Sequence, residues 1–377
     1  MKPVVWLARM SSATLVASVA SVASIASIAS IASIASIASI AAPARAQSAN
    51  GLYFQHRDWE IACDNTGTCR AAGYHAEADD RRVSVLLTRA AGPGRPVAGV
   101  MMLGEDDDRR TLPARSPRIA LEMRIDGRGV GTVSVGRDEL RGALSADQVR
   151  ALTAALRRDT RIEWVLGARR WRLSDAGASA VLLKMDAFQG RLDTPGALVR
   201  TGARAEQSVP PPRPAPLVRA VAIPPTPPED ARRFLAAAAP WQAALATTVE
   251  ADGCPLLKHD DRAHWSAVRL DRTKWLVSAP CWQAAYNTGD GYWVIDAAAP
   301  AARPVLVTTS GVDFSDGVVS SGQKGRGVGD CWSLDDWTWD GSRFVHTSSA
   351  TTGLCRLMSA GGAWELPTRV SDVRPAK

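Results

Sequence analysis

The segment Asp58–Tyr74 reads DWEIACDNTGTCRAAGY and predicts a β-hairpin. Trp59, Ile61 and Cys63 recur at every second position, which is typical of a strand with one buried face. The turn sequence DNTG follows at 64–67, and Cys69 opens the returning strand. We therefore expect a disulfide between Cys63 and Cys69 that closes this hairpin.

Further strands are predicted after this hairpin by apolar runs that Gly, Pro and Asp clusters separate. They cover Val83–Thr88, Val97–Leu103, Ile119–Ile125, Val130–Val135, Ile162–Leu166 and Arg170–Leu173. Their spacing is typical of antiparallel sheets.

Two helices are predicted in the same part of the chain. Ser145-Ala-Asp-Gln148 is a capping box, followed by Val149, Leu152 and Leu156 at helical spacing. Ser174 is expected to cap a second helix, which Gly190 ends. Its shared face consists of Val181, Leu182, Met185 and Phe188. Residues 47–207 are therefore predicted to form an α+β domain.

A proline-rich segment follows this domain. Ser208–Pro228 reads SVPPPRPAPLVRAVAIPPTPP, in which prolines are too dense for a helix interior or a central strand. We expect an extended, semi-rigid linker rather than a ligand for a proline-binding domain.

The segment after the linker, residues 229–377, is rich in tryptophan and predicts a mostly β domain. The Asp340-Gly341 pair is a hairpin signal between two of its strands. The β-like segments are Lys274–Val277, Tyr292–Ile295, Val305–Thr308, Trp337–Trp339 and Phe344–His346. The predicted fold class is α+β: a β-rich N-terminal domain with two helices, a Pro-rich linker and a mostly β C-terminal domain with disulfides.

The first 46 residues predict a signal peptide. Lys2 and Arg9 precede a long uncharged stretch, and Ala44-Arg45-Ala46 supplies small residues at positions −3 and −1 of a cleavage site. The stretch is long enough for an uncleaved anchor, but the Ser in each Ile-Ala-Ser repeat lowers its hydrophobicity. We expect cleavage after Ala46 and a periplasmic or secreted protein without a stable membrane span.

Export determines how the six cysteines are interpreted. An oxidising compartment favours disulfides, and the C-x-x-C spacing of zinc sites is absent from the sequence. Six cysteines allow 15 pairings. Proximity selects Cys63–Cys69, Cys254–Cys281 and Cys331–Cys355, although the sequence does not determine connectivity beyond this choice of neighbours.

The charge of the chain gives little support to a nucleic-acid partner. Removing Lys2, Arg9 and Arg45 with the signal peptide lowers the formal charge from +7 to +4. This charge is dispersed over two predicted domains, so the arginines are interpreted as a solvated surface.

Three segments resemble an exported bacterial family known as domain of unknown function 1176. They are Asp58–Tyr74, KGRGVGDCW from Lys324 to Trp332, and GGAWELPT from Gly361 to Thr368. The first half is also weakly similar to the invasion-associated locus B proteins, which share a W-x-x-x-C opening. The resemblance implies an envelope protein and supplies no catalytic residues.

One glycine-rich loop is the best candidate for a binding site. Its residues are Lys324, Gly325, Arg326, Gly327, Gly329 and Asp330. Closely spaced glycines allow a nest of backbone N–H groups, and the two cations suit a phosphate or carboxylate. We expect Gly327→Val to damage binding and fold. The alternative is a turn that only positions Cys331.

A second, weaker candidate is a cluster of histidines and carboxylates: His259, Asp260, Asp261 and His264. This set could hold a divalent metal or perform acid-base chemistry. A solvated loop is the alternative, because a spacing of five aligns the two histidines on neither an ideal helix nor a strand. The sequence therefore implies no cofactor.

Two functions remain. The first is an envelope binding protein for a protein, glycan or peptidoglycan fragment. The second is an envelope hydrolase of unfamiliar type that uses the histidine cluster. The sequence contains neither Gly-x-Ser-x-Gly nor His-Glu-x-x-His, so it favours binding and leaves catalysis uncertain.

We predict that protein isolated from the envelope begins at Gln47 and has no free thiol. Intact mass and thiol titration of the unfolded chain measure both. An uncut N-terminus would support the anchor, and two or more titratable thiols would contradict three disulfides.

Overall fold

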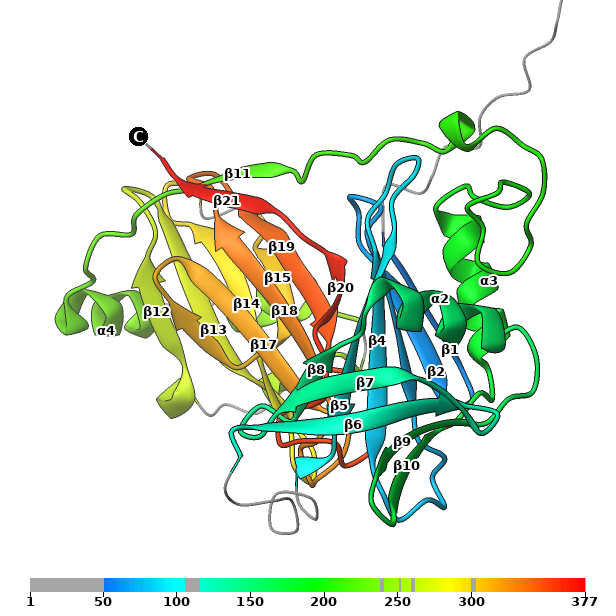
Figure 1. Cartoon of the computed structure of the whole chain (residues 1–377). Helices are drawn as coiled ribbons and strands as arrows, with labels where there is room; N and C mark the ends of the chain where they lie inside the picture. Colours follow the sequence, from blue (N-terminus) through cyan, green and yellow to red (C-terminus); the bar gives the residue numbers. More distant parts are fainter. Residues whose placement is uncertain are drawn as a thin grey trace, which may run out of the picture. The chain divides into compact units, whose positions relative to one another are not determined.

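The strand Trp59–Cys63 (β2), at the centre of the predicted hairpin, is buried at every position. The computed structural model that contains it describes residues 51–105, 116–237, 241–250, 252–258, 262–299 and 303–376. β2 and β3 (Cys69–Tyr74) belong to an antiparallel sheet with the order β1-β2-β3-β4-β5-β8 (Figure 1). The other strands are β1 (Leu52–His56), β4 (Val83–Arg89), β5 (Val97–Leu103) and β8 (Arg141–Ala143).

A second sheet packs against one face of the first through a shared apolar core. Its order is β10-β9-β6-β7, with β6 (Arg118–Ile125), β7 (Arg128–Gly136), β9 (Ile162–Leu166) and β10 (Arg169–Leu173). Trp59, Ile61 and Cys63 point into this core, as the alternation predicts. The strands expected in this half of the chain are therefore present.

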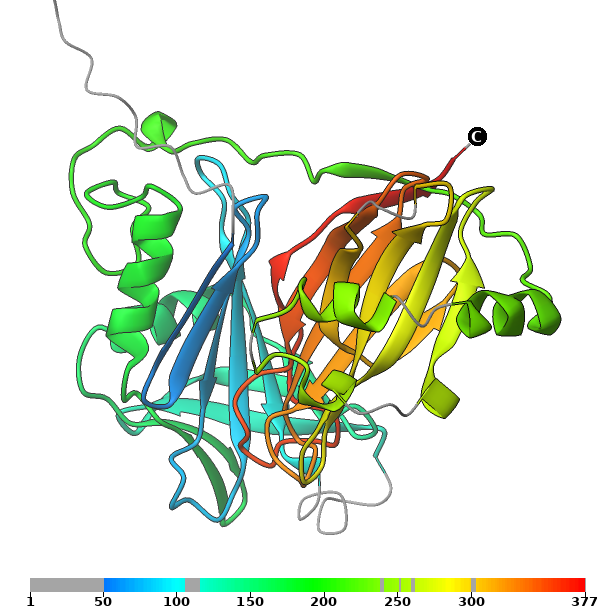
Figure 2. The same cartoon turned by 180° about the vertical axis from the view of Figure 1, so that it is seen from behind.

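Both predicted helices of this half are present. In α2 (Ala146–Ala155) the capping box of Ser145 and Gln148 forms as expected. Helix α3 (Ala178–Phe188) packs against β1 and β2 (Figure 2) and ends before Gly190, whose φ is +66°.

The predicted cap of α3 is wrong. Its N-cap is Gly177 instead of Ser174. The Ser174 hydroxyl donates to Asp58 at 2.6 Å and accepts the N–H of Ala176, so it closes a turn before the helix. The Ser174 hydroxyl therefore bonds to the Asp58 carboxylate and to the local backbone instead of capping the helix.

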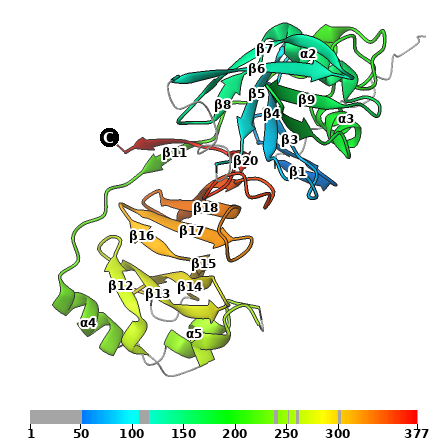
Figure 3. The same cartoon turned by 60° about the horizontal axis from the view of Figure 1, so that its bottom comes forward.

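The second half contains a sheet in the order β12-β13-β14-β15, with β12 (Ser266–Arg269), β13 (Lys274–Gln283), β14 (Thr288–Asp296) and β15 (Val305–Gly311). The helices α4 (Pro228–Ala236) and α5 (Trp241–Ala246) lie on one side of it (Figure 3), where Trp275 and Trp293 are buried. Neither helix was predicted.

The other side of that sheet packs on a five-stranded sheet through Leu276, Tyr292, Val294, Val319 and Trp339. Its strands are β16 (Asp313–Ser315), β17 (Val318–Lys324), β18 (Trp332–Trp339), β19 (Phe344–Thr351) and β20 (Leu366–Arg369). The Asp340-Gly341 pair connects β18 to β19, as predicted. The structure is thus mostly β with few helices.

The proline-rich segment is extended but is not a free spacer. Its proline-free part, Leu217–Ala220 (β11), pairs in parallel with Asp372–Pro375 (β21) (Figure 1). The amide of Arg213 donates to the Thr66 carbonyl at 3.0 Å. Residues other than proline, which have a backbone N–H that can donate, attach the segment to both halves. The division into domains at 47–207 and 229–377 stays a prediction. The contacts make Gln47–Lys377 one compact unit.

Disulfides join Cys63 to Cys69, Cys254 to Cys281 and Cys331 to Cys355, the same pairs that the sequence predicts. In the part of the chain that the structure describes, no helix has both the length and the apolar character to span a bilayer. The predicted signal segment lies outside that part.

The two halves meet on the second face of the first sheet. Ala62, Ala72 and Met102 on this face pack against Trp364 and Leu366 from the C-terminal part. The first sheet is therefore covered on both sides, which explains why β2 has no exposed position.

A buried carboxylate lies at this junction. Glu60 is fully buried and accepts hydrogen bonds from the hydroxyls of Tyr53 (3.0 Å) and Tyr74 (2.6 Å) and from the N–H of Leu354 (2.7 Å). Burial raises the pKa of Glu60 above its ordinary value, because it outweighs the opposite effect of these hydrogen bonds. Three donors from two halves of the chain thus share one acceptor.

We predict that Glu60→Gln changes how stability depends on pH. Between the ordinary pKa of a glutamate and the raised pKa of Glu60, the folded protein holds a proton that the unfolded chain has released. The free energy of unfolding therefore falls as pH rises through this window, and Gln removes this contribution. Urea unfolding at several pH values measures the slope, with the exposed Glu365→Gln as control. An unchanged slope in Glu60→Gln would contradict the assignment.

Glu60→Leu is expected to lower the free energy of unfolding by roughly 3 kcal/mol at a pH below this window, because two hydroxyls and one amide lose the carboxyl acceptor. The difference from wild type is expected to shrink as pH rises through the window, because the contribution of Glu60 falls there. Equilibrium unfolding measures the difference. Wild-type stability in this variant would show that the three donors find water instead.

Candidate functional site

The predicted glycine-rich loop connects β17 to β18, whose register pairs Lys324 with Trp332. Within the loop, the amide of Gly325 donates to the Cys331 carbonyl at 2.8 Å, and that of Gly329 donates to the Arg326 carbonyl at 3.0 Å. These two N–H groups close the turn of the loop itself. They are therefore not free to bind an anion.

Two of the glycines are required by the geometry. Gly329 has a φ of +74°, and a Cβ on Gly325 would lie 2.7 Å from Cys331 Sγ and 3.0 Å from Cys355 Sγ. Gly327 has neither constraint, since a Cβ there would meet Tyr286 at an ordinary 3.5 Å. The space around position 327 therefore does not by itself require glycine, and the damage expected from Gly327→Val stays a prediction.

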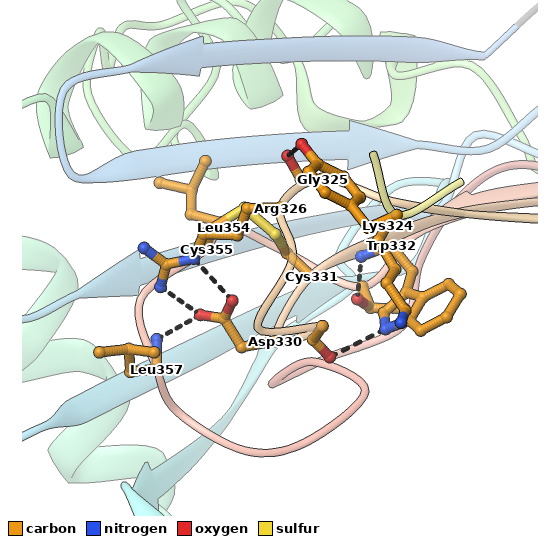
Figure 4. Close-up of a disulfide and its surroundings, with 12 residues drawn as sticks. Lys324, Gly325, Arg326, Asp330, Cys331, Trp332, Leu354, Cys355 and Leu357 are labelled. Carbon is orange, nitrogen blue, oxygen red and sulfur yellow. Dashed lines mark hydrogen bonds and ion pairs between the residues drawn. A yellow bond between two sulfur atoms is a disulfide. The ribbon is translucent and has the colours of Figure 1, made fainter. Parts of the chain in front are cut away.

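The cations of the loop already have partners (Figure 4). Arg326 donates to both carboxylate oxygens of Asp330, at 2.7 and 2.6 Å, and Asp330 also accepts the N–H of Leu357 at 2.6 Å. Burial alone would raise the pKa of Asp330, but these hydrogen bonds hold it below its ordinary value. The Lys324 ammonium lies 5.4 Å from the centre of the Trp332 ring.

The disulfide Cys331–Cys355 ties the loop to residues 352–358, which we call the joining segment. The Asp330 carboxylate and the two sulfurs lie within 4.8 Å of one another. Because both sulfurs are oxidised, neither is a thiolate that would bind a metal ion.

The joining segment reaches the first half of the chain through polar contacts. Arg356 pairs with Asp58 at 2.7 Å, and the Leu357 carbonyl accepts from Arg82 at 3.2 Å. Together with the Glu60 contact to Leu354, these bonds hold the glycine-rich loop beside the turn that follows β3.

A pocket of about 340 Å³ lies between the joining segment and this turn. Basic groups and acidic groups both line it: His75, Arg82, Arg326 and Arg356, and Glu77, Asp79 and Asp80. Cys355 also lines the pocket, and its sulfur forms the disulfide with Cys331.

Two buried polar atoms of the pocket residues have no hydrogen-bond partner among the described residues: His75 Nδ1 and Arg356 Nη1. Burial lowers the pKa of His75, which favours the neutral ring. No sequence pattern indicates these atoms, because their burial depends on two segments about 280 residues apart along the chain.

The second candidate cluster lies mostly outside the residues that the structure describes. His264 is exposed, and His259, Asp260 and Asp261 lie outside the described residues. The metal or acid-base role of these four residues therefore stays a prediction.

We predict that Gly325→Ala destabilises the protein and Gly327→Ala does not. The first change forces a methyl group against the disulfide and is expected to lower the free energy of unfolding by about 1–3 kcal/mol. The second is expected to stay within about 0.5 kcal/mol of wild type. Urea unfolding of the oxidised protein measures both, and equal stabilities would contradict the crowding at Gly325.

Comparisons with known proteins agree with the resemblance seen in the sequence. The chain is 25% identical over 331 residues to the uncharacterized protein YpfG of Escherichia coli strain K12, covering 81% of this chain and 90% of that protein. No solved structure matches. Residues 53–371, which include the hairpin, the glycine-rich loop and the joining segment, match the family described as protein of unknown function (DUF1176). The chain belongs to this DUF1176 family.

Proposed function

We propose that this chain is an exported binding protein that recognises a small envelope ligand carrying both an anionic and a cationic group. A peptidoglycan fragment with free carboxylates and a free amine has this chemistry. The observation that carries the proposal is the pair of unpartnered atoms, His75 Nδ1 and Arg356 Nη1, on residues that line the pocket of about 340 Å³.

A buried donor without an acceptor costs free energy, so a site that retains one is suited to a ligand that supplies the acceptor. Arg356 uses Nη2 for Asp58 and leaves Nη1 for a ligand. A ligand carboxylate satisfies that N–H group, and its second oxygen is available to His75.

The acidic residues of the pocket favour a ligand that also carries a positive charge. Glu77 and Asp80 are exposed and Asp79 is half-buried, so these carboxylates favour an ammonium group on the same ligand. A simple anion would be repelled by them, which distinguishes this site from a phosphate site.

The glycine-rich loop has an indirect role in this proposal. Gly325 and Gly329 shape the turn that begins at Lys324 and includes Gly327, while Arg326 and Asp330 hold the pocket wall against Leu357. The direct anion site predicted at these residues is thus replaced by a neighbouring one at Arg356.

Export itself remains part of the proposal. Three disulfides and a predicted cleavage site after Ala46 support a periplasmic or secreted location. The likeness to the invasion-associated locus B proteins stays a prediction, as does the hydrolase that would use His259, Asp260, Asp261 or His264.

Calorimetric titration of the mature chain with a muropeptide tests the proposal. We expect the muropeptide with free carboxylates and amine to bind at least ten-fold more tightly than its N-acetylated or its carboxyl-esterified form, because each modification removes one charge pair. Equal affinity for all three forms would contradict the proposal.

Two variants locate the site. Glu77→Gln/Asp80→Asn is expected to weaken binding of the free muropeptide several-fold but not that of the acetylated form. Arg356→Lys keeps the pair with Asp58 and is expected to weaken binding because Nη1 is lost. The matched control is Asp147→Asn/Glu229→Gln, which removes two exposed carboxylates from helices elsewhere. A change in the mass of the muropeptide during incubation would instead support the hydrolase.

A further inference from the structure

A second cavity, separate from the proposed muropeptide site, opens between the two sheets of the C-terminal half. Its volume is about 420 Å³, within the range typical of small-molecule sites. Its lining comes from β13, β14 and β15 on one side and from β18, β19 and the hairpin between them on the other. β15 and β18 belong to these two facing sheets (Figure 3).

The walls of the cavity are apolar. Val294, Val305 and Val307 line one side, and Trp337 and Phe344 line the other. β15 is the edge strand of its sheet among the described residues, and Val305 on this strand is 59% exposed. Exposed apolar surface around a cavity is typical of a ligand site.

The Trp337 ring is in contact with a second ring that also lines the cavity. His346 stacks on it with ring centres 4.8 Å apart, and His346 Nε2 lies 2.8 Å from Asp335 Oδ1. A fixed aromatic wall loses little conformational entropy when a ligand packs on it.

The rim of the cavity carries three cations, Lys274, Arg303 and Arg343, and one carboxylate, Asp296. The Asp296 carboxylate accepts the N–H of Ala298 at 3.0 Å. The nearest acidic partners of Lys274 and Arg343 are Asp271 and Asp340, at 3.6 and 3.8 Å.

Backbone amides already engage both of those carboxylates. The amides of Thr273 and Lys274 donate to Asp271 Oδ1, and those of Ser342 and Arg343 donate to Asp340 Oδ1. These two acids form ion pairs with the cations at 3.6 and 3.8 Å, but a lysine has three N–H groups and an arginine five, so Lys274 and Arg343 retain N–H groups for an additional anion.

We infer that this cavity binds an anionic amphiphile, with its apolar body between Val305 and Trp337 and its anionic head at Lys274, Arg303 and Arg343. Carboxylates and phosphate monoesters are both anionic head groups, so the proposed ligand class includes amphiphiles with either one. The three cations exclude an amphiphile with a cationic head.

Calorimetry of the mature chain with four octyl probes tests the class. Octanoate and octyl phosphate are expected to bind, whereas octanol and octylammonium bind at least ten-fold more weakly. Tighter binding of octyl phosphate would indicate a phosphate head, and tighter binding of octanoate a carboxylate. Equal binding of octylammonium, or no binding of either anion, would overturn the inference.

A matched pair of arginines tests the head-group site. Arg343 is 76% exposed and pairs with the acid three residues earlier, and Arg233 on α4 is 79% exposed in the same arrangement with Asp230. We expect Arg343→Ala to weaken octanoate binding at least five-fold and Arg233→Ala to leave it unchanged.

A second pair tests the apolar site. Val305→Asp places a carboxylate at the cavity wall and is expected to abolish binding of both anions, whereas Val312→Asp, at another exposed valine, does not. Thermal melting without ligand checks that all four variants are folded. If Val305→Asp and Arg343→Ala were folded and bound octanoate like wild type, the cavity would not be the site.

Discussion

The buried carboxylate of Glu60 determines how the two halves of this protein can be joined. It requires several donors at once, because one unpaired charge in this position would be strongly destabilising. Two donors, Tyr53 and Tyr74, come from strands on either side of β2, and the third is a backbone amide of the joining segment. The disulfide at Cys355, the Arg356–Asp58 pair and the composite pocket all depend on the position of that segment.

Most strands of the first half were predictable because one face carries apolar residues at every second position, whereas β1 and β8 were not predicted. The burial of the opposite face of these strands was not predicted. Ala62, Ala72 and Met102 occupy the face that simple alternation assigns to water, yet they are buried. Small and apolar residues on both faces of one strand are a signal for burial on two sides, and this signal was available in the segment Asp58–Tyr74.

The candidate site was predictable only in part. Glycine spacing identified the loop between β17 and β18, and cysteine proximity gave its disulfide. Sequence alone did not indicate that Arg326 is paired with Asp330, since an i,i+4 pair outside a helix depends on the turn that forms. The unpartnered atoms of His75 and Arg356 depend on tertiary burial, as does the cavity beside Trp337, so local patterns cannot predict either.

The contact between Glu60 and Leu354 also constrains the order of folding. The two residues are 294 positions apart, so a chain synthesised from its N-terminus contains the Glu60 strand long before the partner residue is made. During that interval the apolar surface around Ala72 and Met102 is uncovered and able to aggregate. The first sheet therefore completes its second buried face only after the joining segment is in place, and the Cys331–Cys355 disulfide then links that segment to the glycine-rich loop.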